Sequence, residues 1–275
     1  MKSYLKTKDF SVSQEVFELL YDEEKELMVT HPKPKNLEAY YESEAYISHT
    51  DSKQTFLESL YQTVKKVNLN RKVKLAEGYC NGNRKLLDIG SGTGDFLAVA
   101  NRKGWNVAGV EPNQKARQKS SSKGIDARST LDEIGDQKFQ VITLWHVLEH
   151  LPDLETSITQ INKLLHDNGT LIVAVPNYKS WDANYYKEHW AAYDVPRHLW
   201  HFSKTAIETI FSMQGFRLVK TKPMWFDAFY VSILSEKYRE SNFVFVKGIL
   251  FGLWSNMRAM VTKECSSQIY ILQKA

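Results

Sequence analysis

The chain is poor in cysteine and in long apolar runs. It has two cysteines among 275 residues, Cys80 and Cys265, and neither stands in a CxxC or metal-ligand spacing. This pattern provides no disulfide framework and suits a reducing cytosol. The opening MKSYLKTKDF lacks the apolar segment of a secretory signal. The longest apolar stretch, 243–254, is interrupted by Lys247 and is shorter than the ~20 residues of a membrane span. We therefore expect a soluble, cytoplasmic protein.

The chain also lacks a strong excess of one charge. Its 36 basic and 32 acidic residues leave a net charge of +4, and its short basic clusters are mixed with acids. Such clusters usually form a solvated helix face, so nucleic-acid binding is not expected. No internal repeat or low-complexity tract is present. The length allows one large domain, alone or with a small module.

The pattern of apolar and polar residues divides the chain into four parts. Residues 1–50 are predicted to form a small hairpin module, with strands at 15–21 and 26–30. Residues 51–222 form the main domain and open with a helix over 51–78. The aromatic-rich segment 223–267 is a helical insertion, and 268–275 carry the last strand.

From residue 85 onward, strand and helix patterns alternate. This alternation predicts an α/β fold, a doubly wound and mostly parallel seven-stranded sheet covered on both faces. Ligands of such sheets bind outside the carboxyl ends of the strands. The predicted strands are 85–89, 106–110, 124–128, 139–144, 170–175 and 216–222, with helices at 113–123, 156–166 and 204–214 among those between them.

Two of these strands end in residues suited to a nucleoside. The first ends in LLDIGSGTGDF, where Gly90, Gly92 and Gly94 would let a ligand approach the backbone at a helix start. A tight turn that binds nothing is the alternative. The second strand ends in Glu111, 21 positions after Gly90, where ~20 is expected for a ribose-binding acid. Glu111 could instead be an acid favoured by a helix N-terminus.

The turn favours one class of cofactor over another. A nicotinamide-binding fingerprint reads G-x-G-x-x-G/A, but the sixth position here is Asp95, which would repel a pyrophosphate. Asp88 before the turn suits a ligand with a cationic amino group and no phosphate. S-adenosylmethionine (SAM) has both properties. A nicotinamide-dependent oxidoreductase is the alternative.

Four stretches resemble class I SAM-dependent methyltransferases. LLDIGSGTGDF resembles their first motif, and VAGVEPN resembles their second. FQVITLWHVLEHLPD is similar to the fourth-strand motif of the branch that contains ubiquinone-biosynthesis O-methyltransferases. LLHDNGTLIVAVP is similar to the helix, turn and fifth strand of that branch. The resemblance covers roughly residues 80–222.

The resemblance implies a cofactor site. Asp88, Gly90 and Gly92 would line the methionine end of SAM, and Glu111 would take the ribose. The loop 126–131 would lie near adenine, with Trp145 and His146 near the sulfonium. The full set of expected cofactor-binding residues is Asp88, Gly90, Ser91, Gly92, Gly94, Glu111, Pro112, Thr130, Leu131, Trp145 and His146.

The segment 176–203 follows the fifth strand and should lie over the methyl group. Its aromatic rings could stabilise a sulfonium and form flat walls for a planar acceptor. We expect Trp200 and Phe202 to be only a covering core. The expected substrate pocket consists of Tyr178, Trp181, Tyr186, Trp190, Arg197 and His201.

Methyl transfer to a hydroxyl is helped by a general base. The stretch RHLWHFS resembles the segment of ubiquinone-type enzymes in which a histidine stands near the acceptor, so His198 is the expected base. His146 is the second candidate, and His150 is expected to be structural. His198 and His201 are spaced like a metal pair, but no further ligand is placed nearby and the N-terminal hairpin lacks cysteines, so no metal is expected.

The sequence therefore predicts a SAM-dependent methyltransferase acting on a small molecule, with a hydroxyl oxygen preferred as acceptor. A nucleic-acid methyltransferase is disfavoured, because the fourth strand is followed neither by an Asn- or Asp-Pro-Pro motif nor by a cysteine. A SAM-binding protein without turnover is a further alternative. The insertion 223–267 could be a lid, a dimer interface or a shallow membrane contact, and a lid is preferred.

Overall fold

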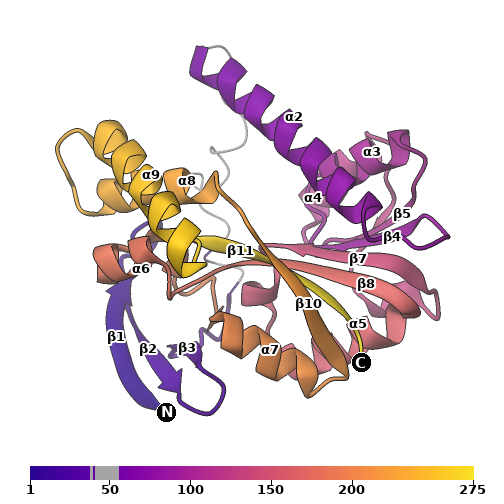
Figure 1. Ribbon diagram of the computed structural model, residues 1–275, viewed down its shortest axis with the longest axis horizontal. Helices are drawn as coiled ribbons and strands as arrows, with labels where there is room; N and C mark the ends of the chain where they lie inside the picture. Colours follow the sequence, from indigo (N-terminus) through magenta and orange to yellow (C-terminus); the bar gives the residue numbers. More distant parts are fainter. Residues whose placement is uncertain (38–39, 41–55) are drawn as a thin grey trace.

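A computed structural model describes residues 1–37, 40 and 56–275, without the side chains of 56–64. The described chain forms one large sheet with helices on both faces and a smaller sheet at one side (Figure 1). Residues 51–55 of the predicted first helix, and the boundary at residue 50, lie outside the described residues.

The large sheet has seven strands in the order β10-β11-β8-β7-β4-β5-β6. The five strands from β8 to β6 are parallel, and β11 is antiparallel to both of its neighbours. The predicted fold class is therefore confirmed. The strands are β4 (Lys85–Ile89), β5 (Asn106–Val110), β6 (Ala127–Arg128), β7 (Phe139–Trp145), β8 (Leu165–Pro176), β10 (Phe216–Pro223) and β11 (Ser267–Lys274).

Apolar side chains on both faces of these strands build two cores. Leu87 and Ile142 face one core and Leu86 and Val141 the other, because successive side chains of a strand point to opposite faces. In Figure 1 the helices α5 (Leu154–Leu164) and α7 (Lys204–Ser212) cover one face, and α2 (Phe56–Glu77) and α3 (Asp95–Arg102) cover the other. The remaining helices of this part are α4 (Gln114–Ser121) and the 3₁₀ turns η2 (Asp132–Ile134) and η3 (Leu148–His150).

Several boundaries differ from the prediction, and the strand predicted over 170–175 is longer, Leu165–Pro176. The strand predicted over 124–128 is only Ala127–Arg128, because the backbone N–H of Ile125 donates to Ser120 O at the end of α4 rather than to β5. The helix predicted over 156–166 begins two residues earlier, where Asp153 caps it by accepting from Thr156 N. It ends at Leu164, and β8 begins at once with Leu165 opposite Phe139.

The smaller sheet is antiparallel, with the order β1-β2-β3-β9. The predicted hairpin corresponds to β2 (Val16–Asp22) and β3 (Leu27–His31), whereas β1 (Lys2–Lys8) and β9 (Trp200–His201) were not predicted. Since β9 belongs to the main domain and pairs with β3, one sheet joins the first and second predicted parts. The division into four parts stays a prediction.

Between β10 and β11 the chain forms a helical hairpin, α8 (Asp227–Tyr238) and α9 (Val244–Thr262). Its start lies at the carboxyl end of β10, on the same edge of the sheet as the glycine turn. Among the described residues, no helix is long and apolar enough to cross a membrane. The segment after β8 forms α6 (Trp181–Tyr186) and the 3₁₀ turns η4 (Lys187–His189) and η5 (Ala191–Tyr193).

Candidate active site

The glycine turn after β4 is held against the end of β5. The N–H groups of Gly90 and Ser91 both donate to Val110 O, at 2.7 and 3.0 Å. Gly90 has a φ of +70°, and a Cβ there would lie 2.3 Å from a methyl group of Val147. Gly92 has a φ of +53°, yet no described atom lies within 4 Å of a Cβ built on it. The turn is therefore packed at Gly90 and open at Gly92, where a ligand can reach the backbone.

The predicted ribose acid lies at this opening. One carboxylate oxygen of Glu111 accepts from Gly92 N at 2.9 Å, and the other accepts from Asn113 N at 2.8 Å. Pro112 beside it is exposed. Thr130 is exposed and Leu131 half-buried, and both follow β6 at the same edge of the sheet. The structure thus places the expected ribose and adenine residues along one edge.

Asp88 is buried at the end of β4. Its carboxylate accepts from Thr143 Oγ at 2.6 Å, and burial raises its pKa to about 7 despite the opposing effects of Thr143 and Lys72. Lys72 of α2 places its ammonium 4.4 Å from the ring centroid of Trp145. Burial lowers the pKa of Lys72, while Asp88 and Asp227 act to raise it. Acids and an aromatic face thus surround the Lys72 amine beside the turn.

Two polar atoms beside the turn are buried without a hydrogen-bond partner in the described part of the chain. They are the Ser91 hydroxyl and the indole nitrogen of Trp145. Buried polar atoms are normally paired, so these two are available to a ligand. Together with the open face of Gly92, they fit a polar ligand that can both donate and accept hydrogen bonds.

His146 follows β7 in a left-handed conformation with a φ of +57°. Its Nε2 lies 3.0 Å from an oxygen of Asp227, and its Nδ1 lies 3.3 Å from an oxygen of Glu149. Burial lowers the pKa of His146, but the two carboxylates outweigh burial and raise that pKa to about 10. The imidazole is therefore cationic at neutral pH.

His198 lies on the other side of Glu149. Its Nδ1 is 2.9 Å from Ala192 O, and because a carbonyl oxygen only accepts, Nδ1 carries a proton. Its Nε2 lies 4.0 Å from a carboxylate oxygen of Asp194. Its ring packs edge-on against His150, with centroids 4.6 Å apart. Leu199 N donates to Glu149 O at 2.8 Å and holds the two segments together. Both candidate bases therefore flank one carboxylate.

Glu149 is fully buried between these histidines. Burial raises its pKa, but His146, His198 and His150 together lower that pKa to about 2, so the group is an anion. Neither of its oxygens has a hydrogen bond of good geometry within the described ranges. Glu149, His150 and His198 bring one ligand atom each within 4.8 Å of one another, a set that a divalent metal could occupy. The expectation that no further ligand lies near His198 is thus corrected.

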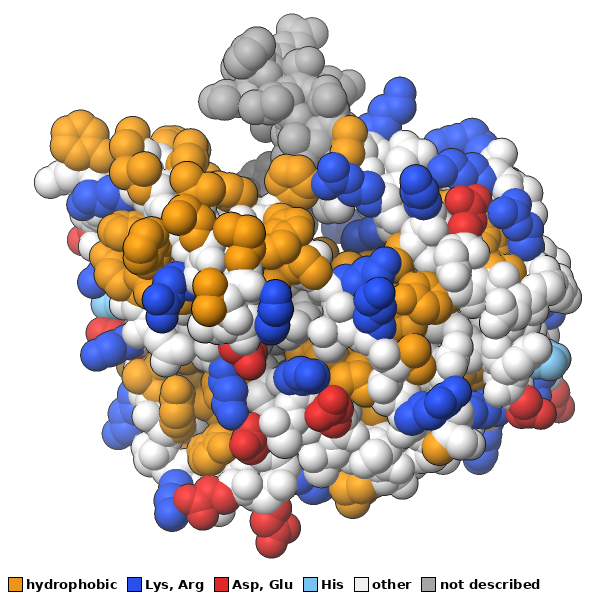
Figure 2. All heavy atoms as spheres, viewed as in Figure 1, with side chains coloured by type: hydrophobic (Ala, Val, Ile, Leu, Met, Phe, Trp, Pro, Cys, Tyr) orange, Lys and Arg blue, Asp and Glu red, His pale blue; other side chains and the backbone are white. Residues whose placement is uncertain are grey.

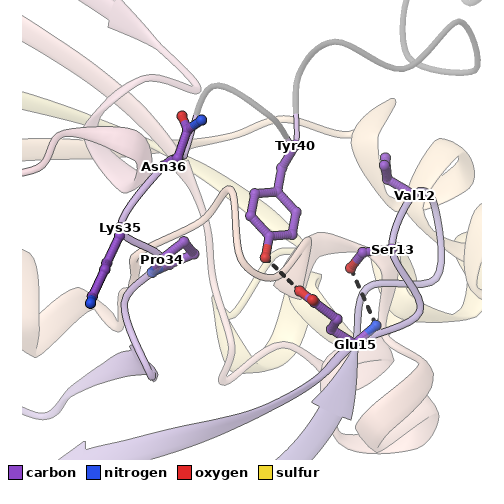
Figure 3. Close-up of a pocket in the computed structure, with 7 residues that line it drawn as sticks. All are labelled: Val12, Ser13, Glu15, Pro34, Lys35, Asn36 and Tyr40. Atoms are coloured by element: carbon purple, nitrogen blue, oxygen red, sulfur yellow. Dashed lines mark hydrogen bonds between the residues drawn. The ribbon is translucent and has the colours of Figure 1, made fainter.

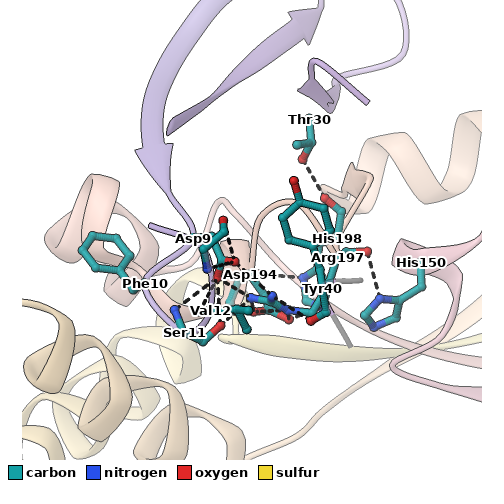
Figure 4. Close-up of polar contacts among 12 residues, drawn as sticks. Asp9, Phe10, Ser11, Val12, Thr30, Tyr40, His150, Asp194, Arg197 and His198 are labelled. Atoms are coloured by element: carbon teal, nitrogen blue, oxygen red, sulfur yellow. Dashed lines mark hydrogen bonds and ion pairs between the residues drawn. The ribbon is translucent and has the colours of Figure 1, made fainter. Parts of the chain in front are cut away.

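Arg197 is buried in a network that joins the N-terminal module to the segment before His198. Its guanidinium donates to Asp9 at 2.9 Å and to Asp194 at 2.6 Å, and to Ser11 Oγ at 2.5 Å (Figure 4). Asp194 O in turn accepts from His198 N at 3.0 Å. The structure therefore gives Arg197 a part in positioning His198, where the sequence predicts a pocket wall.

The Asp9 carboxylate makes stability depend on pH. Burial raises its pKa, but bonds from Arg197 and Ser13 outweigh burial and lower that pKa from 3.8 to about 2. A lowered folded pKa stabilises the fold above the unfolded value, so this contribution is lost as pH falls from about 4 to about 2. We expect the unfolding free energy of Asp9→Asn to fall less steeply over this range than that of the unchanged protein. Urea unfolding at several pH values measures it, and parallel curves would contradict the assignment.

The remaining expected pocket residues lie in a separate core under the small sheet. The Tyr178 hydroxyl donates to Glu26 O at 2.8 Å, and Trp190 Nε1 donates to Asp182 at 2.8 Å. His201 Nε2 lies 2.9 Å from the Thr30 hydroxyl, and burial lowers its pKa to about 3. Tyr186 is buried, and Trp181 stacks on Tyr185 at 5.0 Å. These side chains are held by the protein, and their contact with an acceptor stays a prediction.

Trp200, expected as part of a covering core, is half-buried and donates to Leu151 O at 2.7 Å. Phe202, expected in the same core, is buried.

A hollow of about 430 Å³ in the N-terminal module lies between Val12, Lys35 and Tyr40 (Figure 3). It contains none of the predicted site residues.

Three residues of the site were not predicted: Lys72, Glu149 and Asp227. Lys72 stands in a basic cluster of the kind that usually faces solvent, and Asp227 follows the last parallel strand without a motif. Glu149 lies inside the LEH stretch, where the local pattern does not distinguish a buried acid from an exposed one. A carboxylate at the end of a predicted parallel strand was the one available signal for Asp227.

A sequence profile of the methyltransferase domain family matches residues 60–221, more than half of the chain. The chain belongs to the methyltransferase domain family. The resemblance to class I SAM-dependent methyltransferases of the ubiquinone-biosynthesis branch is thereby confirmed.

Two curated relatives are similar to this methyltransferase-family chain, both named ubiquinone biosynthesis O-methyltransferase. The relative from Bradyrhizobium diazoefficiens is 31% identical over 37% of this chain and 43% of its own length. The relative from Erwinia tasmaniensis is 30% identical over 46% of this chain and 57% of its own. The chain thus spans about half the length of these relatives.

Solved structures share the fold at lower identity. Magnesium protoporphyrin IX methyltransferase from Synechocystis, with bound SAH (S-adenosylhomocysteine), aligns with a TM-score of 0.55 at 15% identity, over 86% of this chain and 97% of its own. A SAM-dependent methyltransferase from Archaeoglobus fulgidus aligns with a TM-score of 0.52 at 19% identity, over 77% and 94%. These matches support the fold.

Proposed function

We propose that this protein transfers the methyl group of SAM to a hydroxyl oxygen of a small acceptor. The observation that carries the proposal is His198, whose Nδ1 is held by Ala192 O so that Nε2 can accept a proton. The curated relatives named O-methyltransferases support the choice of oxygen.

The residues beside the glycine turn fit SAM. Asp88 would hold the amino group, Glu111 the ribose hydroxyls, and the face of Trp145 the positive sulfur. When bound, SAM supplies a methyl group on a positively charged sulfur, which is activated for transfer.

The protein's part is to position the acceptor and to take its proton. His198 Nε2 accepts the hydroxyl proton as the oxygen takes the methyl group, and the imidazolium that forms is stabilised by the Glu149 carboxylate. His146 is unsuited to this role in its present setting, because Asp227 and Glu149 keep it protonated. Its two ring nitrogens face these carboxylates instead.

Gly92→Ala tests the cofactor half of the proposal. A Cβ at Gly92 enters the open space that we assign to SAM, so the affinity for SAH should fall about tenfold or more, equal to ~1.4 kcal/mol. Gly124→Ala is the matched control, because Gly124 also has a positive φ and no described atom within 4 Å of its Cβ position. Calorimetric titration with SAH should give unchanged affinity for this control.

Equal affinity of both variants for SAH would contradict the assignment of the glycine turn to SAM. Titration with NADH tests the oxidoreductase alternative, and binding of NADH without SAH would overturn the proposal. Turnover of labelled SAM with simple phenols then separates an enzyme from a SAM-binding protein, and mass spectrometry of the product identifies the methylated atom.

A further inference from the structure

Helix α9 turns its large apolar side chains outward. Gly248, Gly252, Ser255 and Ala259 form its buried face. A helix of a protein surrounded by water usually has the opposite arrangement. The exposed large apolar residues of α9 are Phe245, Val246, Ile249, Leu250, Leu253, Trp254, Met257, Met260 and Val261, with Phe243 just before them.

The packing of α9 on α8 enforces this orientation. A Cβ on Gly248 would lie 2.5 Å from Ile233 Cγ1 and 2.6 Å from its Cα, and one on Gly252 would lie 2.8 Å from Phe229 Cα. The two backbones are therefore in contact at the glycines, as in the small-residue interfaces of helices in membranes. Larger side chains have no room on this face. The apolar surface thus cannot be hidden by rotating the helix.

The exposed apolar surface continues onto the residues just before α8 and its first turn. Trp225 and Phe226 are each 40% exposed and Tyr230 is 62% exposed. Figure 2 shows hydrophobic side chains gathered over the α8–α9 hairpin. Contiguous apolar surface of this extent marks a binding face rather than a solvated one. These side chains point outward, and the interpretation of the insertion as a lid stays a prediction.

Along α9 itself the charged residues are all of one sign, while Glu240 and Glu264 lie just outside it. From 243 to 263 the sequence contains no aspartate or glutamate, and its charged residues are Lys247, Arg258 and Lys263. Basic residues beside exposed Trp, Phe and Leu are the pattern of helices that lie in the interface of anionic membranes. A second copy of the chain fits less well, because its residues 243–263 would bring three further basic residues and no acid of their own, and Glu240 and Glu264 lie only at the ends of the face.

The face also reaches the candidate site. Trp225 and Phe226 directly precede Asp227, whose carboxylate lies 3.0 Å from His146 Nε2. We propose that the exposed face of α9, together with Trp225, Phe226 and Tyr230, rests on the surface of an anionic phospholipid bilayer. Docking there sets the site at the lipid surface, within reach of an apolar acceptor. The docking itself does not depend on the proposed methyl transfer.

Flotation of the full chain with phospholipid vesicles tests this proposal. We expect binding to equimolar phosphatidylglycerol and phosphatidylcholine, and weaker binding to phosphatidylcholine alone or at high salt. The variant Leu250→Glu/Met257→Glu should bind at least about tenfold more weakly, because both side chains are exposed and would be carried into the interface. The matched control Met213→Glu/Val219→Glu makes the same change at exposed apolar residues, one directly after α7 and one in β10, and should bind like the unchanged protein.

SAH titration of both variants shows whether the fold is kept. Failure of the unchanged protein to float with anionic vesicles would overturn the proposal, as would an equal loss of binding in both variants. Light scattering without vesicles provides a second test. A dimer that only the α9 variant converts to a monomer, with no vesicle binding, would assign the face to a second copy.

Discussion

His198→Ala is expected to lower the rate of methyl transfer by ~10²–10⁴-fold while the affinity for SAH stays unchanged. The substitution removes the Nε2 electron pair that we assign to proton removal. It leaves the glycine turn, Glu111 and Asp88 intact. Since the methyl group is already activated, the residual rate should reflect positioning by the rest of the site.

The measurement is turnover of labelled SAM with an accepted phenol, together with SAH calorimetry and the melting temperature. His166→Ala is the control, because His166 is exposed on β8 and should keep full activity. An unchanged rate for His198→Ala would remove the assignment of the base. A lower rate that comes with a lower melting temperature and weaker SAH binding would assign His198 a structural role instead.

Arg197→Ala should lower the free energy of unfolding by ~3–5 kcal/mol, since removing one partner of a buried ion pair leaves uncompensated charge. Asp9 is almost fully buried, and Asp194 contacts the same guanidinium. Without Arg197 the Asp9 carboxylate must be protonated or hydrated. The small sheet would then be held to the main domain mainly by its apolar contacts and the β3–β9 pairing.

Urea unfolding measures this change, with Arg102→Ala as the control. Arg102 is exposed in the last turn of α3, and its loss should cost within about 0.5 kcal/mol. Arg197→Ala should also lose activity, because Arg197 holds Asp194, and Asp194 positions the backbone of His198. Equal stabilities of the two variants would show that the network is not holding the module.

The sequence was most informative where structure depends on neighbouring residues. The bounds of β4 and β5 agree with the prediction, because short apolar runs are followed by polar breaks. The glycine turn and Glu111 meet as expected, because a strand-turn-helix unit brings them to the same edge. Local sequence cannot show β9, which has two residues and forms only by pairing with β3.

Contacts between segments that are distant in the sequence also limit prediction of the site. His146 meets Asp227 across the sheet, and His198 meets Glu149 because a backbone hydrogen bond joins two distant segments. The charge of His146 follows from these partners and not from its place in the motif. Arg197 shows the converse, since a residue beside the expected base is held by an aspartate that is 188 positions away.

That separation also affects the order of events at the ribosome. Asp9 is synthesised long before Arg197, so its carboxylate lacks this partner until five of the seven strands of the large sheet have been translated. We infer that the first hairpin waits in contact with water and docks late, when the chain beyond β8 has left the exit tunnel. The pocket around His198 therefore cannot assemble before the segment after β8 has been translated, and a shorter chain carries no functional site.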